Sequence, residues 1–392
     1  MSILPAALAA LTLLQAAATV LLVIRLLPGR RRQPPVEPLP DDSHAGRVTV
    51  VVTCLDEVHR IGPCLEGLRA QGPAMLEALI VDSRSTDGTW ELVQDAARQD
   101  SRIRPMHDDP LPPEWVGKVW ALEHGLRHAK GEWVLGIDAD TTPAPGLVAA
   151  AVGAADLLGY DAVSFAPRFD DMTVAEQWLQ PAMLVTLVYR FGAAGEKAPP
   201  ADRVMANGQC FLAKRSVLLA NGGYSSARRS WCDDVTLARH MARNGARVGF
   251  LDGSKIIGVR AYTGIAQMWR EWGRSIDLKD GTTPFRQLLD VCFVLLTQFV
   301  PLPAVLIALG ADIPPWRAGG VAALWFIVNL VLVSVRCLLQ FALAASYAER
   351  HWTFWLSFTA DPVAAIRIVL SSLKRPRQWR TRAYEQDTVV TA

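Results

Sequence analysis

The sequence predicts an α/β domain with a mainly parallel sheet, flanked on both sides by apolar helices long enough to cross a membrane. First, strand-like and helix-like segments alternate between Arg47 and Gly146 at intervals of roughly 30 residues. Second, residues 3–27, 286–309 and 319–346 are long apolar runs, and about 20 such residues span a bilayer. Third, the mean hydropathy is +0.19 and 51% of residues are hydrophobic, values that are high for a soluble enzyme.

Composition narrows the classes of protein that the chain can belong to. Its 392 residues allow one large domain with additional parts. The net charge of +2 argues against nucleic acid as a partner. The six cysteines contain no C-x-x-C pair, and we expect them to be reduced and buried.

Residues 1–28 are predicted to be a membrane anchor. The apolar run is followed by the basic stretch "RLLPGRRRQPP", whereas a signal peptide carries its charge before the apolar core. We therefore expect an uncleaved helix, with the following domain on the cytoplasmic side of a bacterial membrane. Residues 29–46 are basic and Pro-rich and are predicted to be a linker.

Residues 47–280 are predicted to be the α/β domain. In chain order, the expected elements are a strand (47–55), a helix (60–71), a strand (76–82), a helix (85–99), a short strand (102–108), a helix closed by Gly131 (117–131) and a strand (133–138). Neither G-x-G-x-x-G after the first strand nor G-x-x-x-x-G-K-[ST] occurs. The glycines that cradle phosphates in dinucleotide-binding and P-loop proteins are therefore missing.

Residues 281–375 are predicted to be a second membrane region, followed by a basic tail (376–392). The runs 286–309 and 319–346 are separated by a short connection and indicate a helical hairpin. The segment 352–373 is ambiguous because it carries Asp361 and Arg367. Full spanning would place the basic tail outside, against the positive-inside tendency. We favour an interfacial or re-entrant helix that leaves the tail inside.

Polar side chains gather where the predicted strands end, which is where ligands bind to parallel sheets. These positions are Thr53–Glu57, Asp82-Ser83 and Asp138-Ala139-Asp140. If Asp138 and Asp140 continue the strand, their side chains point to the same face, about 7 Å apart at Cα. Both carboxylates can then reach one divalent cation, with oxygen ligands and a diphosphate as its natural partner. The alternative is that Asp140 caps the Thr-Thr-Pro turn that follows.

Two further positions carry candidate chemistry. Lys118 opens a predicted helix after a glycine, and a helix N-terminus with a lysine makes an anion site; the alternative is a solvated surface lysine. Asp233 and Asp234 open another predicted helix that ends at Gly245. Asp233 is a natural N-cap, which leaves Asp234 available as a general base. The alternative is a pair of solvated acids near the helix dipole.

Six motifs occur in this order over about residues 47–275: "VVVTCLDE", "LIVDSRSTDGT", "GK.WAL", "GIDAD", "NGQCFLAKRSVLLANGGY" and "WCDDVTLARHMARNGARVGFLDG". In order and spacing they resemble the motifs of the family 2 glycosyltransferases with the GT-A fold. The resemblance implies a nucleotide-diphospho-sugar donor, a Mg²⁺ or Mn²⁺ ion and inversion at the anomeric carbon. It assigns the nucleoside to Thr53, Asp56, Glu57 and Asp82, and the phosphates to Lys118. Asp138 and Asp140 serve the metal and sugar diphosphate, and Asp234, beside Asp233, is the base.

The chain departs from the family pattern in two places. Many members have Asp-Asp-Gly where this chain has Asp82-Ser83-Arg84. Processive members carry Q-x-x-R-W, whereas Gln267–Glu271 reads Gln-Met-Trp-Arg-Glu. We expect Trp272 and Arg274 of "WREWGRS" to contribute to the donor site instead. The departure favours a single transfer over chain growth.

The stretches "PLPPEWVGKVWAL", "WGRSIDLKD" and "ADPVAAIRIVLSSLKRPRQWRTRAY" give a finer resemblance, to the carotenoid and hopene-associated glycosyltransferases. It implies a lipid acceptor, and we favour a carotenoid hydroxyl (2'-O or similar). Residues 174–192 are either a buried core helix or a membrane-surface helix that guides an apolar acceptor to the site. Other acceptors are polyprenyl phosphate, a hopanoid or diacylglycerol. A non-catalytic membrane scaffold or transport protein is the alternative from another class.

Overall fold

The computed structural model describes residues 3–39, 44–170, 172–196, 199–260, 262–273, 276–311, 314–374, 378–379 and 382–383. Among these residues the chain forms two compact units. Unit 1 comprises the described parts of 1–31, 171–193 and 262–375. Unit 2 comprises those of 32–170, 194–261 and 376–392. Each unit has its own architecture and is described by itself.

Unit 2 is built on a seven-stranded sheet with the strand order β3-β2-β1-β4-β8-β6-β9. All of its strands run parallel except β8, which is antiparallel to both of its neighbours. This arrangement confirms the predicted α/β class. The strands are β1 (Val48–Cys54), β2 (Met75–Asp82), β3 (Ile103–His107), β4 (Trp133–Asp138), β6 (Ala162–Ala166), β8 (Cys210–Lys214) and β9 (Val248–Asp252). A small second sheet joins β5 (Thr141–Pro143), β10 (Ile257–Val259) and β7 (Arg168–Phe169).

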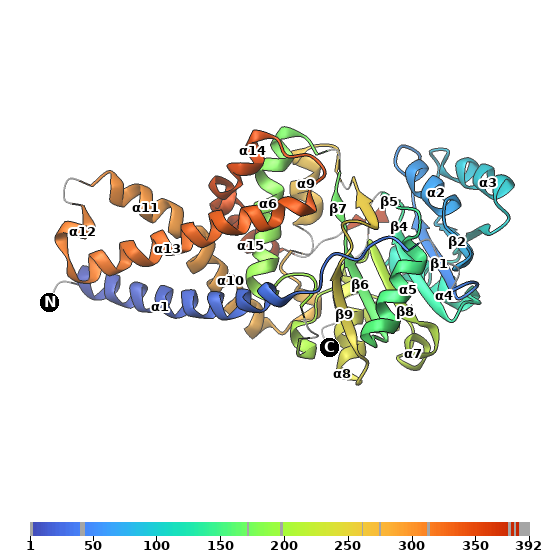
Figure 1. Cartoon of the computed structure of the whole chain (residues 1–392), viewed down its shortest axis with the longest axis horizontal. Helices are drawn as coiled ribbons and strands as arrows, with labels where there is room; N and C mark the ends of the chain where they lie inside the picture. Colours follow the sequence, from blue (N-terminus) through green and yellow to red (C-terminus); the bar gives the residue numbers. More distant parts are fainter. Residues whose placement is uncertain are drawn as a thin grey trace. The chain divides into compact units, whose positions relative to one another are not determined.

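Helices cover both faces of the main sheet (Figure 1). On one face pack α2 (Ile61–Arg69), α3 (Thr89–Gln99) and α5 (Leu147–Leu158); on the other pack α4 (Gly117–His128), α7 (Arg215–Ala220) and α8 (Asp233–Arg243). Successive residues of β1 show that both faces are covered. Val50 and Val52 belong to the apolar cluster that includes α2, α3 and α5, and Val51 belongs to the cluster that includes α4, α7 and α8. A strand that is buried on both faces reads as a continuous apolar run.

Two helix ends differ from the sequence prediction. Helix α3 begins at Thr89 rather than near residue 85, because Asp87 Oδ1 accepts the Thr89 N–H at 3.0 Å and Gly88 adopts a φ of 101°. Helix α4 ends at His128 instead of continuing to Gly131. A Cβ at Gly131 would lie 2.5 Å from the Thr49 backbone nitrogen, so this glycine serves close backbone packing beside β1.

The segment predicted as a linker is extended and packed along unit 2 over residues 32–39. Its backbone donates hydrogen bonds from Gln33 to Gly195, from Val36 to Asp252 and from Leu39 to Gly146. Unlike a flexible coil, it is therefore an ordered part of this unit.

Unit 1 is helical. Its helices are α1 (Ile3–Leu26), α6 (Val174–Phe191), α9 (Ile265–Trp272), α10 (Pro284–Val294), α11 (Pro301–Leu309), α12 (Pro315–Ala318), α13 (Gly320–Leu343), α14 (Trp352–Trp355) and α15 (Asp361–Leu373), with a π-helical turn, Leu295–Phe299, between α10 and α11. Within the described residues, three helical stretches are long and apolar enough to cross a membrane: Pro5–Arg31, Pro284–Leu309 and Gly320–Ser346.

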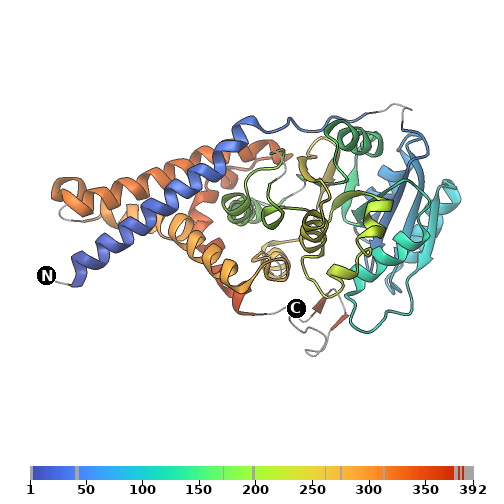
Figure 2. The ribbon, with the colours of Figure 1, turned by 90° about the horizontal axis from the view of Figure 1, so that it is seen from below.

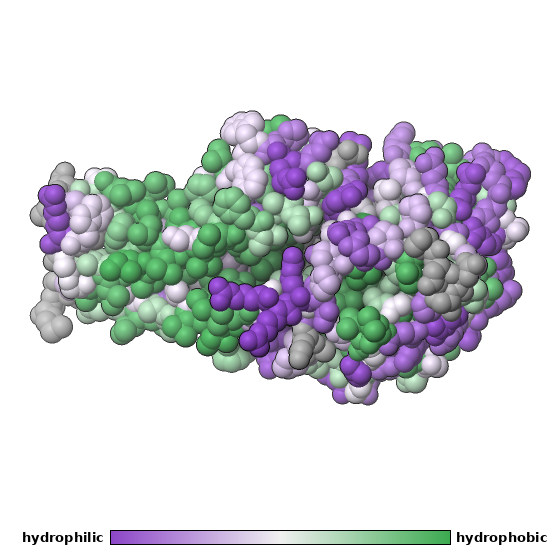
Figure 3. All heavy atoms as spheres, viewed as in Figure 1, coloured by the Kyte–Doolittle hydropathy of each residue, from purple (hydrophilic) through white to green (hydrophobic). Residues whose placement is uncertain are grey.

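The surface of these helices is strongly apolar. Helix α1 runs beside α13 in both ribbon views (Figures 1 and 2). Apolar side chains gather over α1, α11 and α13 (Figure 3). Among the exposed ones are Leu14, Ile307 and Leu338, at 60%, 69% and 69%. Large apolar patches on a protein surface need a non-aqueous partner, and a lipid bilayer fits helices of this length.

The segment 352–373 is not one continuous helix. It consists of α14, a 3-10 turn at Ser357–Ala360 and α15, and it is not among the candidate spans. Its broken form is compatible with an interfacial or re-entrant segment, which stays a prediction.

Helix α6 packs with the helices of unit 1 rather than with the sheet. Most of its residues are buried, including the polar side chains Glu176, Gln180 and Arg190. Thr173 and Glu176 close its first turn with a capping box. The helix is thus largely buried, and a membrane-facing role in guiding an apolar acceptor stays a prediction.

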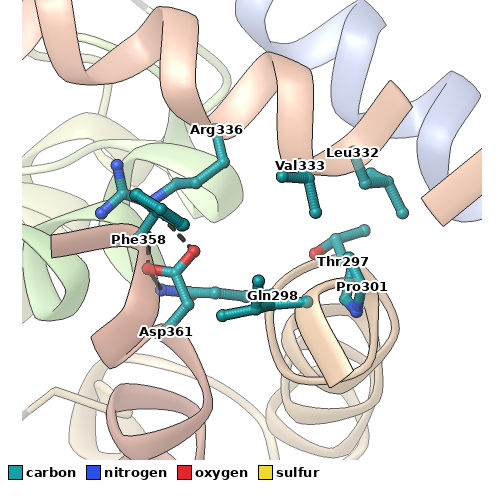
Figure 4. Close-up of a pocket in the computed structure, with 9 residues that line it drawn as sticks. Thr297, Gln298, Pro301, Leu332, Val333, Arg336, Phe358 and Asp361 are labelled. Carbon is teal, nitrogen blue, oxygen red and sulfur yellow. Dashed lines mark hydrogen bonds and ion pairs between the residues drawn. The ribbon is translucent and has the colours of Figure 1, made fainter. Parts of the chain in front are cut away.

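A buried ion pair joins α13 to α15 inside unit 1 (Figure 4). Arg336 Nε lies 2.9 Å from both oxygens of Asp361, and both side chains are at most 6% exposed. The remaining Arg336 nitrogens donate to Gln340 Oε1 at 2.6 Å and Ser357 Oγ at 3.1 Å. The pair borders a cavity of about 10 Å³ that Gln298 also lines, which is about the room that one water needs.

All six cysteines are free. Cys54, Cys64, Cys210 and Cys232 are buried in unit 2, as expected. The prediction is wrong for Cys292, which is exposed, and for Cys337, which is half-buried. Both lie on helices of unit 1 that turn part of their apolar surface outward.

Candidate active site

Three strand ends bring the predicted site residues of unit 2 to one edge of the sheet. Thr53 of β1 pairs with Asp138 of β4, and Cys54 pairs with Asp82 of β2. Because these strands are parallel neighbours, their polar carboxyl ends lie side by side. The register thus places the ends of β1, β2 and β4, which carry three separate motifs, next to one another.

The loop after β1 is tied to the loop after β2. Asp56 adopts a φ of 53°, its N–H donates to Ser85 Oγ at 2.9 Å, and its Oδ1 accepts the Thr86 N–H at 2.9 Å. The Glu57 N–H donates to Thr89 Oγ1 at 2.8 Å. Asp56 and Glu57 therefore hold the shape of the loop, and their contact with a nucleoside stays a prediction.

Asp82 is fully buried at the end of β2. Its Oδ2 accepts the Ser85 N–H at 3.1 Å and lies 3.4 Å from His107 Nδ1. The His107 ring stacks on Trp90, with 3.9 Å between the ring centroids. Ser85 and His107 were not singled out from the sequence. The spacing Asp-x-x-Ser could have indicated a turn that brings Ser85 back to Asp82. His107 lies beside Asp82 because the two residues are paired between β2 and β3, which the sequence alone does not reveal.

Lys118 lies at the start of α4 with its Nζ 2.7 Å from Asp138 Oδ1. Its side chain is 18% exposed, so the solvated-lysine alternative is wrong. Burial by itself lowers the pKa of Lys118, but the nearby carboxylates of Asp138, Asp233 and Asp234 raise it above the usual value. The ammonium group therefore stays charged at the sheet edge.

Asp138 and Asp140 do not share a strand face, contrary to the sequence argument. Strand β4 ends at Asp138, and Ala139 and Asp140 form a turn into β5. Within this turn, Thr141 Oγ1 donates to the Asp138 carbonyl at 2.8 Å. Asp140 Oδ2 instead lies 3.9 Å from Arg60 Nη1, and Asp138 faces Lys118.

Asp233 and Asp234 are the first two residues of α8. The N-cap is Cys232, which makes no side-chain capping bond, so the prediction of Asp233 as N-cap is wrong. Asp234 Oδ2 accepts the Gly208 N–H at 2.8 Å. Burial and the charge of Asp233 raise the pKa of Asp234 to about 7, while burial raises the pKa of Asp233 against the opposing charge of Lys118.

Gly208 brings these groups together from the loop before β8. A Cβ at Gly208 would lie 3.1 Å from Lys118 Nζ and 3.7 Å from Asp234 Oδ2. A larger residue here would crowd the lysine, which explains the glycine of "NGQC". Lys118, Asp138 and Asp234 thus form one compact charged cluster.

The carboxylates suit a divalent cation whose other ligands come from a substrate. Within the described residues, no group of three or more His, Cys, Asp or Glu side chains could hold a metal by itself. Mg²⁺ in proteins is commonly bound by one or two carboxylates together with substrate phosphates and water. Asp138 and Asp140 offer hard oxygen ligands of this kind at the ligand-binding edge.

Two predicted donor-site residues do not belong to the described part of unit 2. Trp272 is the last residue of α9 in unit 1, and Arg274 lies outside the described residues. Their part in a donor site stays a prediction.

Comparison with known proteins supports the reading of unit 2. Residues 49–220 match the family model described as "Glycosyl transferase family 2". Over 93 residues the chain is 33% identical to the lipopolysaccharide core biosynthesis glycosyltransferase LpsC of Rhizobium meliloti (strain 1021) and 29% identical to the glycosyltransferase GlyG of Streptococcus pneumoniae serotype 4. Each match covers 24% of this chain, and the chain spans about a third of each relative, 31% and 30%.

The fold is shared with a solved enzyme over nearly the whole chain. The mannosyltransferase PcManGT from Pyrobaculum calidifontis, solved with GDP-Man and Mn²⁺, superposes with a TM-score of 0.56 at 21% identity. The similarity covers 96% of this chain and all of that one. At this identity the likeness shows the fold, and the fold is the GT-A type with associated helices.

Proposed function

We propose, from the family 2 glycosyltransferase domain that includes residues 49–220, that this chain is a membrane-bound inverting glycosyltransferase. It transfers a sugar from a nucleotide-diphospho-sugar to a hydroxyl group of a lipid. The observation that carries the proposal is the cluster at the sheet edge, where Lys118 pairs with Asp138 beside Asp234. In this cluster the Lys118 ammonium can bind a leaving diphosphate, and the neighbouring Asp234 carboxylate has a raised pKa.

The chemistry follows from the charges of this cluster. Asp234, in its ionised form, removes the proton of the acceptor hydroxyl while the oxygen attacks the anomeric carbon. The bond from that carbon to the diphosphate breaks, and the nucleoside diphosphate leaves with the electron pair. Lys118 stabilises the charge that develops on the diphosphate. Asp138 and Asp140 would hold a Mg²⁺ or Mn²⁺ ion, which would supply Lewis-acid neutralisation of the same group.

The acceptor is a lipid in this proposal because unit 1 offers three candidate membrane spans with apolar surfaces. Among lipids we favour a hydroxylated carotenoid, mainly on the resemblance carried by "WGRSIDLKD". The basic stretch Arg30–Arg32 after α1 supports a catalytic domain on the cytoplasmic side of a bacterial membrane.

The proposal is tested by expressing the chain in a carotenoid-producing bacterium and comparing extracted pigments by mass spectrometry, with wild type beside Asp234→Asn. We expect a hexose or deoxyhexose mass on a hydroxylated carotenoid, absent in the variant. Unchanged pigments, with the protein present in the membrane, would rule out the carotenoid acceptor. A sugar adduct in the hopanoid or polar-lipid fraction would then identify the acceptor class. Nucleotide-sugar binding without any product would favour the scaffold alternative.

The raised pKa of Asp234 predicts a pH dependence. A base works only when it is ionised, so kcat/KM is expected to rise with pH and to level off above about 7, where Asp234 has lost its proton. Below about pH 7, kcat/KM should fall by close to tenfold for each pH unit, because the ionised fraction of Asp234 falls in that way. Asp233→Asn removes the neighbouring charge that raises the pKa of Asp234. The inflection of the kcat/KM profile of this variant should therefore lie at lower pH than in the wild type. A pH profile that is flat from 5.5 to 8 would contradict the assignment.

A further inference from the structure

Arg60 bridges two acidic side chains that come from different strand ends. Its Nη2 lies 2.6 Å from Glu57 Oε2, in the loop after β1, and its Nη1 lies 3.9 Å from Asp140 Oδ2, in the turn after β4. The three side chains are largely buried, with exposed fractions of 17% for Arg60, 6% for Glu57 and 12% for Asp140. One guanidinium therefore links two parts of the chain that are 80 residues apart.

The local helix does not explain this arginine. Arg60 is the N-cap of α2 and makes no side-chain capping bond, although this position favours Ser, Thr, Asp or Asn. A positive charge at a helix N-terminus also opposes the helix dipole. Arg60 thus stands where helix formation disfavours it, which points to a role outside α2.

The contact with Glu57 explains the position of Arg60 Nη2 but not that of Nη1. Glu57 and Arg60 are three residues apart at the turn into α2, and a local ion pair needs nothing from β4. Yet Nη1 is buried, lies on the side of Asp140, and has no hydrogen-bond acceptor among the described residues. A buried donor without an acceptor costs stability, and a shift of about 1 Å toward Asp140 would satisfy it.

We propose that Arg60 is a positioning residue that orients the Asp140 carboxylate toward the divalent cation. The inference rests on the proposed role of Asp140 as a metal ligand. Residues that hold a ligating carboxylate typically change metal affinity 10–100-fold when they are removed. Arg60 suits this task because its planar guanidinium can hold Glu57 and Asp140 at once, with each oxygen in a fixed direction.

The test is direct Mn²⁺ binding to the purified full-length protein in detergent with saturating GDP or UDP, because the cation's other ligands come from the diphosphate. Binding is measured by the loss of the free Mn²⁺ signal in electron paramagnetic resonance, beyond the loss that the nucleotide alone causes. Arg60→Gln is expected to weaken Mn²⁺ binding about 10-fold or more. Arg60→Lys, which keeps the charge but not the two-sided fork, should restore part of the affinity. Arg69→Gln is the matched control, because it removes an exposed arginine from the same helix and should bind Mn²⁺ as the wild type does.

A double-mutant cycle with Asp140→Asn separates positioning from a general charge effect. If Arg60 acts through Asp140, Arg60→Gln weakens Mn²⁺ binding in the wild-type background and has little further effect in Asp140→Asn. Unchanged or tighter Mn²⁺ binding by Arg60→Gln, or full additivity in the cycle, would overturn the proposal. Should Arg60→Gln fail to fold, Arg60→Lys decides by the same cycle. Absence of Mn²⁺ binding by the wild type would instead refute the metal site itself.

Discussion

Asp234→Asn is expected to lower kcat by about 10²–10⁴-fold, the usual contribution of a general base. Asparagine keeps an oxygen that can accept the Gly208 N–H, now at 2.8 Å, so the loop before β8 should hold its shape. Binding of the nucleoside diphosphate should change little, because Lys118 keeps its contact with Asp138. Single-turnover kinetics with a saturating donor, together with calorimetric titration of UDP and GDP, measure the two quantities separately.

The control for this variant is Asp202→Asn. Asp202 is 42% exposed and pairs with Arg243 of α8 at 3.1 Å, so the substitution removes a carboxylate near the same helix without touching the cluster. It should leave kcat unchanged. If Asp234→Asn retained more than about a tenth of the wild-type kcat, the base assignment would fall. A phosphate acceptor, which needs no base, would then fit better.

Breaking the Arg336–Asp361 pair is expected to destabilise unit 1 by about 3–5 kcal/mol, because the partner left behind is a buried charge without its counter-ion. Either Arg336→Met or Asp361→Leu should have this effect, since both side chains are almost fully buried and bonded to each other. Gln298, Gln340 and Ser357 also donate to or accept from the pair, so each single change disturbs a connected network. Unfolding in mixed detergent micelles measures the loss.

The double variant Arg336→Met/Asp361→Leu gives the sharper result. Replacing both charges with apolar side chains of similar size is often neutral or stabilising, so it should recover most of the loss that either single change causes. Arg350→Met is the control, because it removes an exposed arginine of unit 1 whose Nη1 donates to the Ala344 carbonyl at 2.9 Å. If the single variants were as stable as this control, the pair would not stabilise unit 1.

Much of the fold could be read from local sequence. Apolar runs such as Val48–Cys54 and Trp133–Asp138 became β1 and β4, because a strand that is buried on both faces has no polar positions to obscure it. The capping box at Thr173 and Glu176 fixed the start of α6 in the same way. Predicted helix boundaries were wrong where a side chain bonds to the backbone. For example, Asp87 accepts the Thr89 N–H, and α3 begins at Thr89 instead of near residue 85.

The sequence by itself determined the α/β class, the long apolar helices and the residue types at the strand ends, since these depend on periodicity, composition and neighbours along the chain. It could not determine which charges meet. The pairing of Lys118 with Asp138, the approach of Gly208 to Asp234, and the placement of Arg60 between Glu57 and Asp140 join segments 20 to 80 residues apart. Such contacts depend on strand order and register, which only tertiary packing sets. For the same reason the argument that Asp138 and Asp140 share a strand face failed: the last pairing of β4 joins Asp138 to Thr53 of β1, and Ala139 and Asp140 then turn into β5.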